Sequence, residues 1–242
     1  MPHPDDVEIT CGGTIAKLVK LGYRVGIVHM TNGEPTPAGT PEKRAAESAE
    51  AARILGVHHV ETLDLPNREL MDCPAARYAV ATVFRRFRPT VVVGMAGRTP
   101  GASPDHWQGQ LILEAARFYS QLTKWDERFS GTAPHRIDWL WYRPVAISAE
   151  LHAFPATFVI DVSDVYDQKV AAISCYRSQF SEHRLARLLH RVRAIDAADG
   201  SRCGFAYGEL YALPHALPMT DPLAHFRGLT PWVPPSYPPR SG

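Results

Sequence analysis

Two short polar clusters, far apart in the sequence, carry the side chains best suited to chemistry. The first, residues 1–6 (Met-Pro-His-Pro-Asp-Asp), places His3 beside the adjacent carboxylates of Asp5 and Asp6 at a turn stiffened by proline. The second cluster ends at His106. Two imidazoles and one carboxylate make a three-ligand zinc site with an open fourth position for water. One carboxylate is then left over as a base, which completes the minimum set for metal-assisted hydrolysis.

The bulk composition narrows the class of protein. A chain of 242 residues with 45% hydrophobic and 21% charged residues is ordinary for a globular α/β domain. The net charge of +1 gives no indication of a nucleic acid or a membrane surface as partner. The four cysteines form no C-x-x-C pair and are typical of reduced thiols. Without a signal-peptide pattern or a long apolar run, we expect a cytoplasmic protein.

Hydrophobic periodicity and turn residues predict helices and strands in alternation. The predicted helices cover residues 11–21, 41–55, 74–87, 107–122, 163–178 and 182–198. The predicted strands cover residues 25–30, 60–63, 90–94, 138–142 and 157–162. Short connections between them indicate an α/β fold of the Rossmann-like kind, with an open, mostly parallel sheet covered by helices on both faces.

Ligands of such sheets bind beyond the carboxyl ends of the strands. The polar clusters fall in the four loops expected there, residues 3–13, 31–40, 64–72 and 95–106. We expect one domain over residues 1–216, followed by a proline-rich C-terminal tail over residues 217–242.

The motif from His3 to Ile9 (His-Pro-Asp-Asp-Val-Glu-Ile), followed by Cys-Gly-Gly-Thr-Ile-Ala, resembles the signature of the LmbE-like, or PIG-L, zinc-dependent deacetylases. The resemblance continues in order over positions 3–210. Its further motifs are Glu42-Lys-Arg44, Leu65-Pro-Asn67, Pro104-Asp-His106, Pro134-His-Arg136, Tyr176-Arg-Ser-Gln-Phe180 and Tyr207-Gly-Glu209. The late motifs look most like the bacillithiol-biosynthesis branch, which deacetylates N-acetylglucosaminyl-malate.

This resemblance implies roles for particular residues. It implies that His3, Asp6 and His106 hold Zn²⁺, that Asp5 is the general base and that Arg44 contacts a small amino-sugar substrate. It also implies that copies of the chain assemble into trimers or hexamers.

The residues alone leave simpler interpretations open. His3 could lie at a frayed terminus, Asp5 and His106 could only cap a turn or a helix, and Arg44 could be a solvated surface residue. Asp105 could orient a ligand or cap the helix predicted at 107–122, and the two roles are compatible.

The chain departs from the family pattern in two places. Many relatives have histidine where this chain has Ser103, and a serine can bind the substrate by donating a hydrogen bond but cannot act as an acid at neutral pH. Among the remaining histidines, His152 is the best candidate for the missing acid. Relatives also carry a central strand before the first motif, where only Met1 and Pro2 stand here. We therefore expect either a truncated start or an altered sheet edge.

Together these features predict a zinc-dependent hydrolase that removes the N-acetyl group from an N-acetylglucosamine conjugate, with N-acetylglucosaminyl-malate as the first candidate. The alternatives are a deacetylase of another amino sugar and a metal- and sugar-binding pseudoenzyme without turnover. A nucleotide-binding module is a third reading, but Gly12-Gly13 do not form G-x-G-x-x-G. We interpret these glycines as allowing close approach of the substrate at a helix start.

Overall fold

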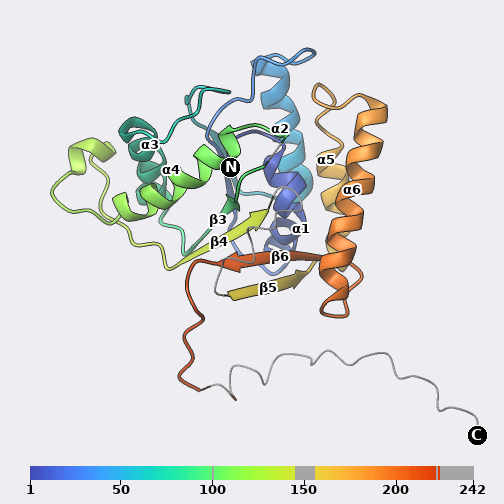
Figure 1. Cartoon of the computed structure of the whole chain (residues 1–242). Coiled ribbons are helices and arrows are strands. Elements are labelled where there is room, and N and C mark those ends of the chain that lie inside the picture. The colour runs from blue at the N-terminus through green and yellow to red at the C-terminus, as the bar shows by residue number, and fades with distance from the viewer. Residues whose placement is uncertain (100, 145–155, 222, 224–242) are drawn as a thin grey trace, which may run out of the picture.

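Helices and strands alternate along most of the chain in the computed structural model, which describes residues 1–99, 101–144, 156–221 and 223 (Figure 1). The α-helices are α1 (Asp6–Lys20), α2 (Pro41–Leu55), α3 (Pro74–Phe87), α4 (Asp105–Tyr119), α5 (Tyr166–Ile173) and α6 (Glu182–Ser201). The strands are β1 (Gly26–His29), β2 (His59–Thr62), β3 (Val91–Ala96), β4 (Trp139–Pro144), β5 (Ala156–Asp161) and β6 (Gly208–Leu213). Short 3₁₀ helices cover Asp126–Phe129 and Ser163–Val165. No helix in these described segments is both long and apolar enough to cross a membrane.

The ends of α2 show how local sequence sets an element. Thr40 accepts a hydrogen bond from the backbone N–H of Lys43, and Pro41 occupies the first helical position. Gly56 ends the helix with a left-handed φ of 72°, a conformation that costs glycine little. The predicted helix over 41–55 is therefore confirmed at both ends.

The strands form an open arrangement in two parts. β1 and β2 pair in parallel, while the other four strands form a sheet in the order β3-β4-β6-β5. β3 and β4 are parallel, and β6 runs antiparallel to both of its neighbours. The predicted open α/β fold is confirmed, but the sequence analysis contains no strand at β6, which adds the antiparallel pairs.

The chain start lies along β1. The ammonium group of Met1 donates to the carbonyl oxygen of Val28 at 2.8 Å, and the N–H of Thr31 donates to the carbonyl oxygen of Pro2 at 2.9 Å. These bonds place His3 directly beyond the carboxyl end of β1. Among the described strands none joins β1 to β3, and the two alternatives given for the start of the chain stay predictions.

Two hydrophobic clusters cover the two faces of the larger sheet. Leu140 and Tyr142 point into one cluster with α3 and α4, whereas Trp141 between them packs against the other cluster, which contains α1 and α5. On β6, Ala212 and Tyr211 divide in the same way. This alternation is the period-two signature of a strand buried on both faces. Figure 1 shows α3 and α4 on one side and α1, α5 and α6 on the other.

Four predicted helices have different bounds in the structure, and the one predicted at 182–198 continues to Ser201. The helix predicted at 11–21 begins at Asp6, the helix predicted at 107–122 begins at Asp105, and α5 covers only part of residues 163–178. Within α1 the backbone leaves helical geometry at Cys11, where φ is −132° and ψ is 19°. The interpretation of Gly12 and Gly13 as a substrate approach was wrong, because a Cβ on Gly13 would lie 2.8 Å from Cβ of Val162. The small residues let α1 pack closely on its neighbours.

A buried ionic network holds the bend in α1. The Glu209 carboxylate accepts the N–H groups of Gly13 and Thr14 at 3.0 and 2.9 Å, as an N-cap would for the second half of the helix. Nζ of Lys169 donates to Glu209 and to Asp196 at 2.7 and 2.6 Å. The network therefore sets the direction of the half of α1 that carries Asp6.

Arg143 completes this network from β4. Its guanidinium donates to Asp196 at 2.7 Å, and its Nε donates at 2.9 Å to the carbonyl oxygen of Thr10, at the bend. Most of the predicted tail over residues 217–242 lies outside the described residues, and the domain boundary at 216 stays a prediction.

We expect Lys169→Met to destabilise the fold by about 3–5 kcal/mol, because it removes the cation that Glu209 and Asp196 share and leaves Glu209 without an ion-pair partner among the described residues. The free energy of unfolding in urea measures this loss. Lys17→Met is the matched control, since Lys17 pairs with a surface carboxylate, Asp164. The control should lose less than about 1 kcal/mol. Equal losses in the two variants would contradict a structural role for the buried network.

Candidate metal centre

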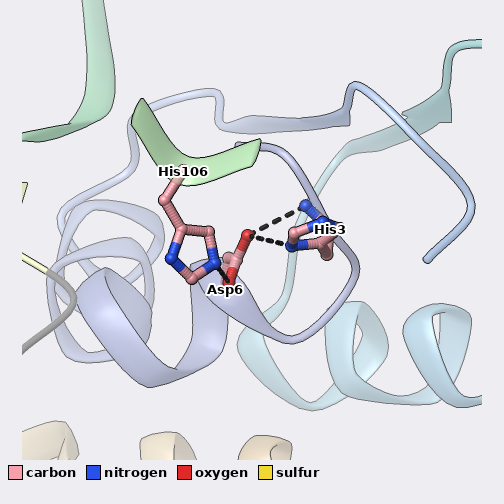
Figure 2. Close-up of side chains that lie close together, drawn as sticks. All are labelled: His3, Asp6 and His106. Carbon is pink, nitrogen blue, oxygen red and sulfur yellow. Dashed lines mark hydrogen bonds and ion pairs between the residues drawn. The ribbon is translucent and has the colours of Figure 1, made fainter. Parts of the chain in front are cut away.

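Three side chains from separate segments meet at the carboxyl end of β1. His3 lies in the turn before α1, Asp6 is the first residue of α1, and His106 lies in the first turn of α4. One possible ligand atom from each residue lies within 4.8 Å of the others, and Figure 2 shows the two rings facing the same carboxylate. The structure thus brings together the three residues that the sequence analysis assigned to the metal.

Asp6 is the centre of this group. Its two carboxylate oxygens lie 3.2 Å from Nδ1 of His3 and 3.4 Å from Nε2 of His106. Burial opposes ionisation of Asp6, but hydrogen bonds from His106 and His3 outweigh it and hold its pKa well below the usual range. Asp6 is therefore anionic, as a ligand must be.

The outer nitrogen of His3 is held by Asp105. Nε2 of His3 donates to Oδ2 of Asp105 at 3.0 Å, and the same oxygen accepts the backbone N–H of Arg68 at 2.7 Å. Burial disfavours the protonated ring of His3, but the hydrogen bonds to Asp6 and Asp105 outweigh it and raise its pKa to about 9. Asp105 makes no capping bond at the start of α4, so its carboxylate serves the histidine and not the helix.

The outer nitrogen of His106 is held by Thr99. Nδ1 of His106 lies 2.9 Å from Oγ1 of Thr99, whose hydroxyl donates to the carbonyl oxygen of Ser103. The threonine oxygen can therefore accept a hydrogen bond from Nδ1–H of His106, which leaves Nε2 facing Asp6. The sequence analysis missed Thr99, because nothing in its local sequence separates it from any other loop threonine.

This arrangement fits a metal ion. In metal sites, each ligating imidazole presents one nitrogen to the ion while an outer partner fixes the other. His3 and His106 both follow that pattern, with Asp6 as the third donor. An N₂O donor set is typical of catalytic zinc, so His3, Asp6 and His106 would hold the ion and leave room for substrate and water.

Asp5 stands next to the candidate metal ligand Asp6 in a strained conformation. Its φ of 102° lies in a region that non-glycine residues rarely adopt, and such strain often marks functional positions. Its side chain makes no capping bond to α1, which removes the simpler interpretation. The carboxylate lies 3.6 Å from Nη2 of Arg44. Burial raises the pKa of Asp5 to about 8 against the opposing effect of that guanidinium charge.

Arg44 is not the solvated surface residue that its place on a helix permits. Only 3% of the residue is exposed. Its guanidinium faces Asp5, but Nε and Nη1 have no hydrogen-bond partner among the described residues. A buried charge with unpartnered donors is costly unless a ligand or water completes it. Arg44 is thus placed to bind an oxygen-rich group beside Asp5.

Ser103, which stands at the position of the family histidine, and His152, the candidate for its acid role, have different outcomes. Ser103 lies just before α4, where its Oγ accepts the backbone N–H of Asp105 at 3.3 Å. It therefore helps to set the start of the helix that carries His106, and its role toward a substrate stays a prediction. His152 lies outside the described residues.

The comparisons with known proteins agree with this geometry. Residues 1–116 match the family model described as PIG-L, GlcNAc-PI de-N-acetylase. The chain is 30% identical over 219 residues to a diacetylchitobiose deacetylase of Thermococcus kodakarensis, an alignment that covers 86% of this chain and 79% of the relative. The chain belongs to the PIG-L, or LmbE-like, deacetylase family.

The likeness to this PIG-L family extends to the whole fold. The structure of the N,N'-diacetylchitobiose deacetylase from Pyrococcus horikoshii has a TM-score of 0.77 and 27% sequence identity, covering 90% of this chain and 85% of that one. A 4-oxalmesaconate hydratase of Pseudomonas putida is also 27% identical, over 73% of this chain and 71% of its own length. Relatives with this fold thus carry the names of two different enzymes, so the reaction has to be argued from the site.

His106→Ala should abolish high-affinity zinc binding. We expect an affinity loss above about 100-fold, because removing an outer-shell partner alone costs about 10–100-fold. Titration calorimetry with zinc, together with metal analysis of the purified variant, measures the change. His135→Ala is the control, since His135 is half-buried and bonds the carbonyl oxygen of Pro89. Unchanged zinc content in His106→Ala would refute this ligand.

Asp105→Asn should keep the fold and weaken zinc binding by about 10–100-fold, since the charge that orients His3 is lost. The same calorimetric titration measures it. An affinity equal to that of the wild-type protein would show that the contact between Asp105 and His3 does not tune the metal site.

Proposed function

We propose that this protein is a metal-dependent hydrolase that removes the N-acetyl group from an N-acetylglucosamine conjugate. The observation that carries the proposal is the position of Asp5, a carboxylate that neither binds in the ligand cluster nor caps its helix. It stands between the ligand Asp6 and the buried cation of Arg44. A carboxylate that can act as the base thus lies beside one metal site, as metal-assisted amide hydrolysis requires, and a cation that can bind the substrate lies next to it.

The residues of the chain divide the work between them. Bound at His3, Asp6 and His106, the metal would supply Lewis acidity toward the amide carbonyl and the attacking water. Asp5 takes the proton from that water and can return it to the departing amine, which gives one carboxylate both roles where relatives use a histidine. Arg44 binds an oxygen-rich part of the substrate through its two unpartnered nitrogens.

For the finer assignment, we propose zinc as the metal and N-acetylglucosaminyl-malate as the substrate. The two-imidazole, one-carboxylate donor set supports zinc. The late sequence motifs support the malate conjugate, as do two exposed arginines on the loops beyond β2 and β3. Arg68 is bound through its backbone to Asp105, and Arg98 lies over the ring of Trp107, which neighbours His106. Such guanidinium groups suit the carboxylates of a malate aglycone.

The second candidate is a deacetylase of another amino sugar, which the diacetylchitobiose deacetylase relative favours. A pseudoenzyme is a weaker alternative, because a site without turnover has no need of the base at Asp5. The assembly into trimers or hexamers and the cytoplasmic location stay predictions.

Acetate release separates these possibilities. Zinc-loaded protein is given N-acetylglucosaminyl-malate, diacetylchitobiose or free N-acetylglucosamine, each with and without a chelator. We expect chelator-sensitive release that is fastest on the malate conjugate. Faster release from diacetylchitobiose would favour the second candidate. No release from any of the three by protein with zinc bound would contradict deacetylation of these sugars.

Asp5→Asn should retain zinc and lose at least about 100-fold in kcat, because an amide cannot take the proton of water. Steady-state acetate release and the zinc content of the same preparation test this together. Full activity in the variant would remove Asp5 from the mechanism. Asp64→Asn, an exposed carboxylate on the loop after β2, controls for the loss of one surface charge.

A further inference from the structure

The guanidinium of Arg44 is buried without the contacts that normally fix such a group. Its nearest carboxylate oxygen, on Asp5, is 3.6 Å away, and two of its nitrogens have no described partner. A long, flexible side chain in that condition needs another contact to hold one orientation, since fixing its rotamer costs conformational entropy.

The face of Tyr176 supplies that contact. The Arg44 guanidinium carbon lies 5.5 Å from the centroid of the Tyr176 ring, within the range of a cation–π interaction. Such interactions are strongest where water is excluded, and only 1% of Tyr176 is exposed. The Tyr176 ring therefore restricts the movement of the guanidinium on the side that faces the ring.

Tyr176 is itself fixed from the direction of the metal ligands. Its hydroxyl donates to Oε1 of Glu8 at 3.0 Å. Glu8 is fully buried in the first turn of α1, two residues beyond Asp6. The tyrosine follows α5 in the chain, so it connects α5, the ligand-bearing turn of α1 and the arginine of α2.

The backbone of the loop after β1 also lies close to the guanidinium. Gly33, in the loop after β1, has a φ of 73°, and a Cβ at this position would lie 2.8 Å from Nη2 of Arg44. The guanidinium thus lies between the Tyr176 ring, the Gly33 backbone and the Asp5 carboxylate. With these three neighbours in place, the unpartnered N–H groups of Arg44 can donate only to a group that binds on a side that none of the three covers.

We propose that Tyr176 is a positioning residue that holds Arg44 in its substrate-binding orientation through the face of its ring, with Glu8 fixing the ring. The proposal rests on the proposed function, because the contact of Arg44 with the substrate is part of that function. The hydroxyl of Tyr176 fixes the ring by its hydrogen bond to Glu8, whereas the face of the ring contacts Arg44.

Kinetics of paired variants test the role in substrate binding. Tyr176→Leu removes the ring and should raise KM about tenfold with little change in kcat, the size of a desolvated cation–π contact. Tyr176→Phe keeps the ring and should keep a KM close to that of the wild-type enzyme. Adding Tyr176→Leu to Arg44→Gln should raise KM no further, because the tyrosine acts through the arginine.

Phe129→Leu is the matched control for the loss of a buried aromatic ring beside an arginine. Phe129 is also buried, and the guanidinium carbon of Arg85 lies 3.7 Å from the centroid of its ring, outside the candidate site. This variant should lose stability without a change in KM. An equal rise of KM in Phe129→Leu would overturn the proposal, as would a KM of the Tyr176→Leu/Arg44→Gln double variant above that of Arg44→Gln. Tyr176→Met, which keeps more volume, replaces the leucine variant should that fail to fold.

The Arg44 Nε–Hε signal in the nuclear magnetic resonance spectrum gives a readout that needs no substrate. The signal is assigned by its loss in Arg44→Gln. The ring current of Tyr176 should shift it in the wild-type protein and in Tyr176→Phe, and the shift should vanish in Tyr176→Leu. An unchanged signal in Tyr176→Leu would overturn the proposal whatever the activity. The expected shifts in a protein that deacetylates nothing would support the contact and contradict the proposed function instead.

Discussion

The site depends on one shared carboxylate. Asp6 faces an imidazole on each of its oxygens, and those imidazoles come from segments separated by most of the first half of the chain. Neither histidine can hold this position alone, so Asp105 and Thr99 fix their outer nitrogens. The fold has to deliver the turn before α1 and the first turn of α4 to the same end of the sheet within hydrogen-bonding distance. Much of the remaining structure can be understood as meeting that requirement.

The bend in α1 shows that buried residues of the core help to place the turn that carries Asp6. Breaking a helix at Cys11 exposes backbone donors and acceptors on both sides of the break, and a buried network satisfies them. Glu209 accepts the freed N–H groups, and Arg143 donates to the freed carbonyl oxygen of Thr10. A charge network of this kind is expensive to bury but enforces one geometry once it is complete. The direction of the ligand-bearing turn is therefore set from the opposite face of the helix.

The sequence predicts what local chemistry determines. Thr40 and Gly56 define both ends of α2 by capping alone. The residue types in the two polar clusters indicate a metal site, but the choice of Asp6 over Asp5 as the ligand comes from the family resemblance. Prediction from the sequence fails where contacts between residues far apart in the chain determine the local structure. β6 is a strand because it pairs with β4 and β5, and Cys11 leaves helical geometry because groups from two strands complete the bend. The sequence also allows Arg44 to be a surface residue, because only the tertiary structure brings the loop at Gly33 and the ring of Tyr176 against it.

The central claim is that a metal ion binds where His3, Asp6 and His106 converge. The most direct measurement is a crystal structure of zinc-loaded protein with anomalous diffraction collected on both sides of the zinc edge. The account predicts one strong anomalous peak within bonding distance of Nδ1 of His3, Nε2 of His106 and a carboxylate oxygen of Asp6. A peak at other residues, or no peak at this site in protein shown to be folded and supplied with zinc, would contradict it.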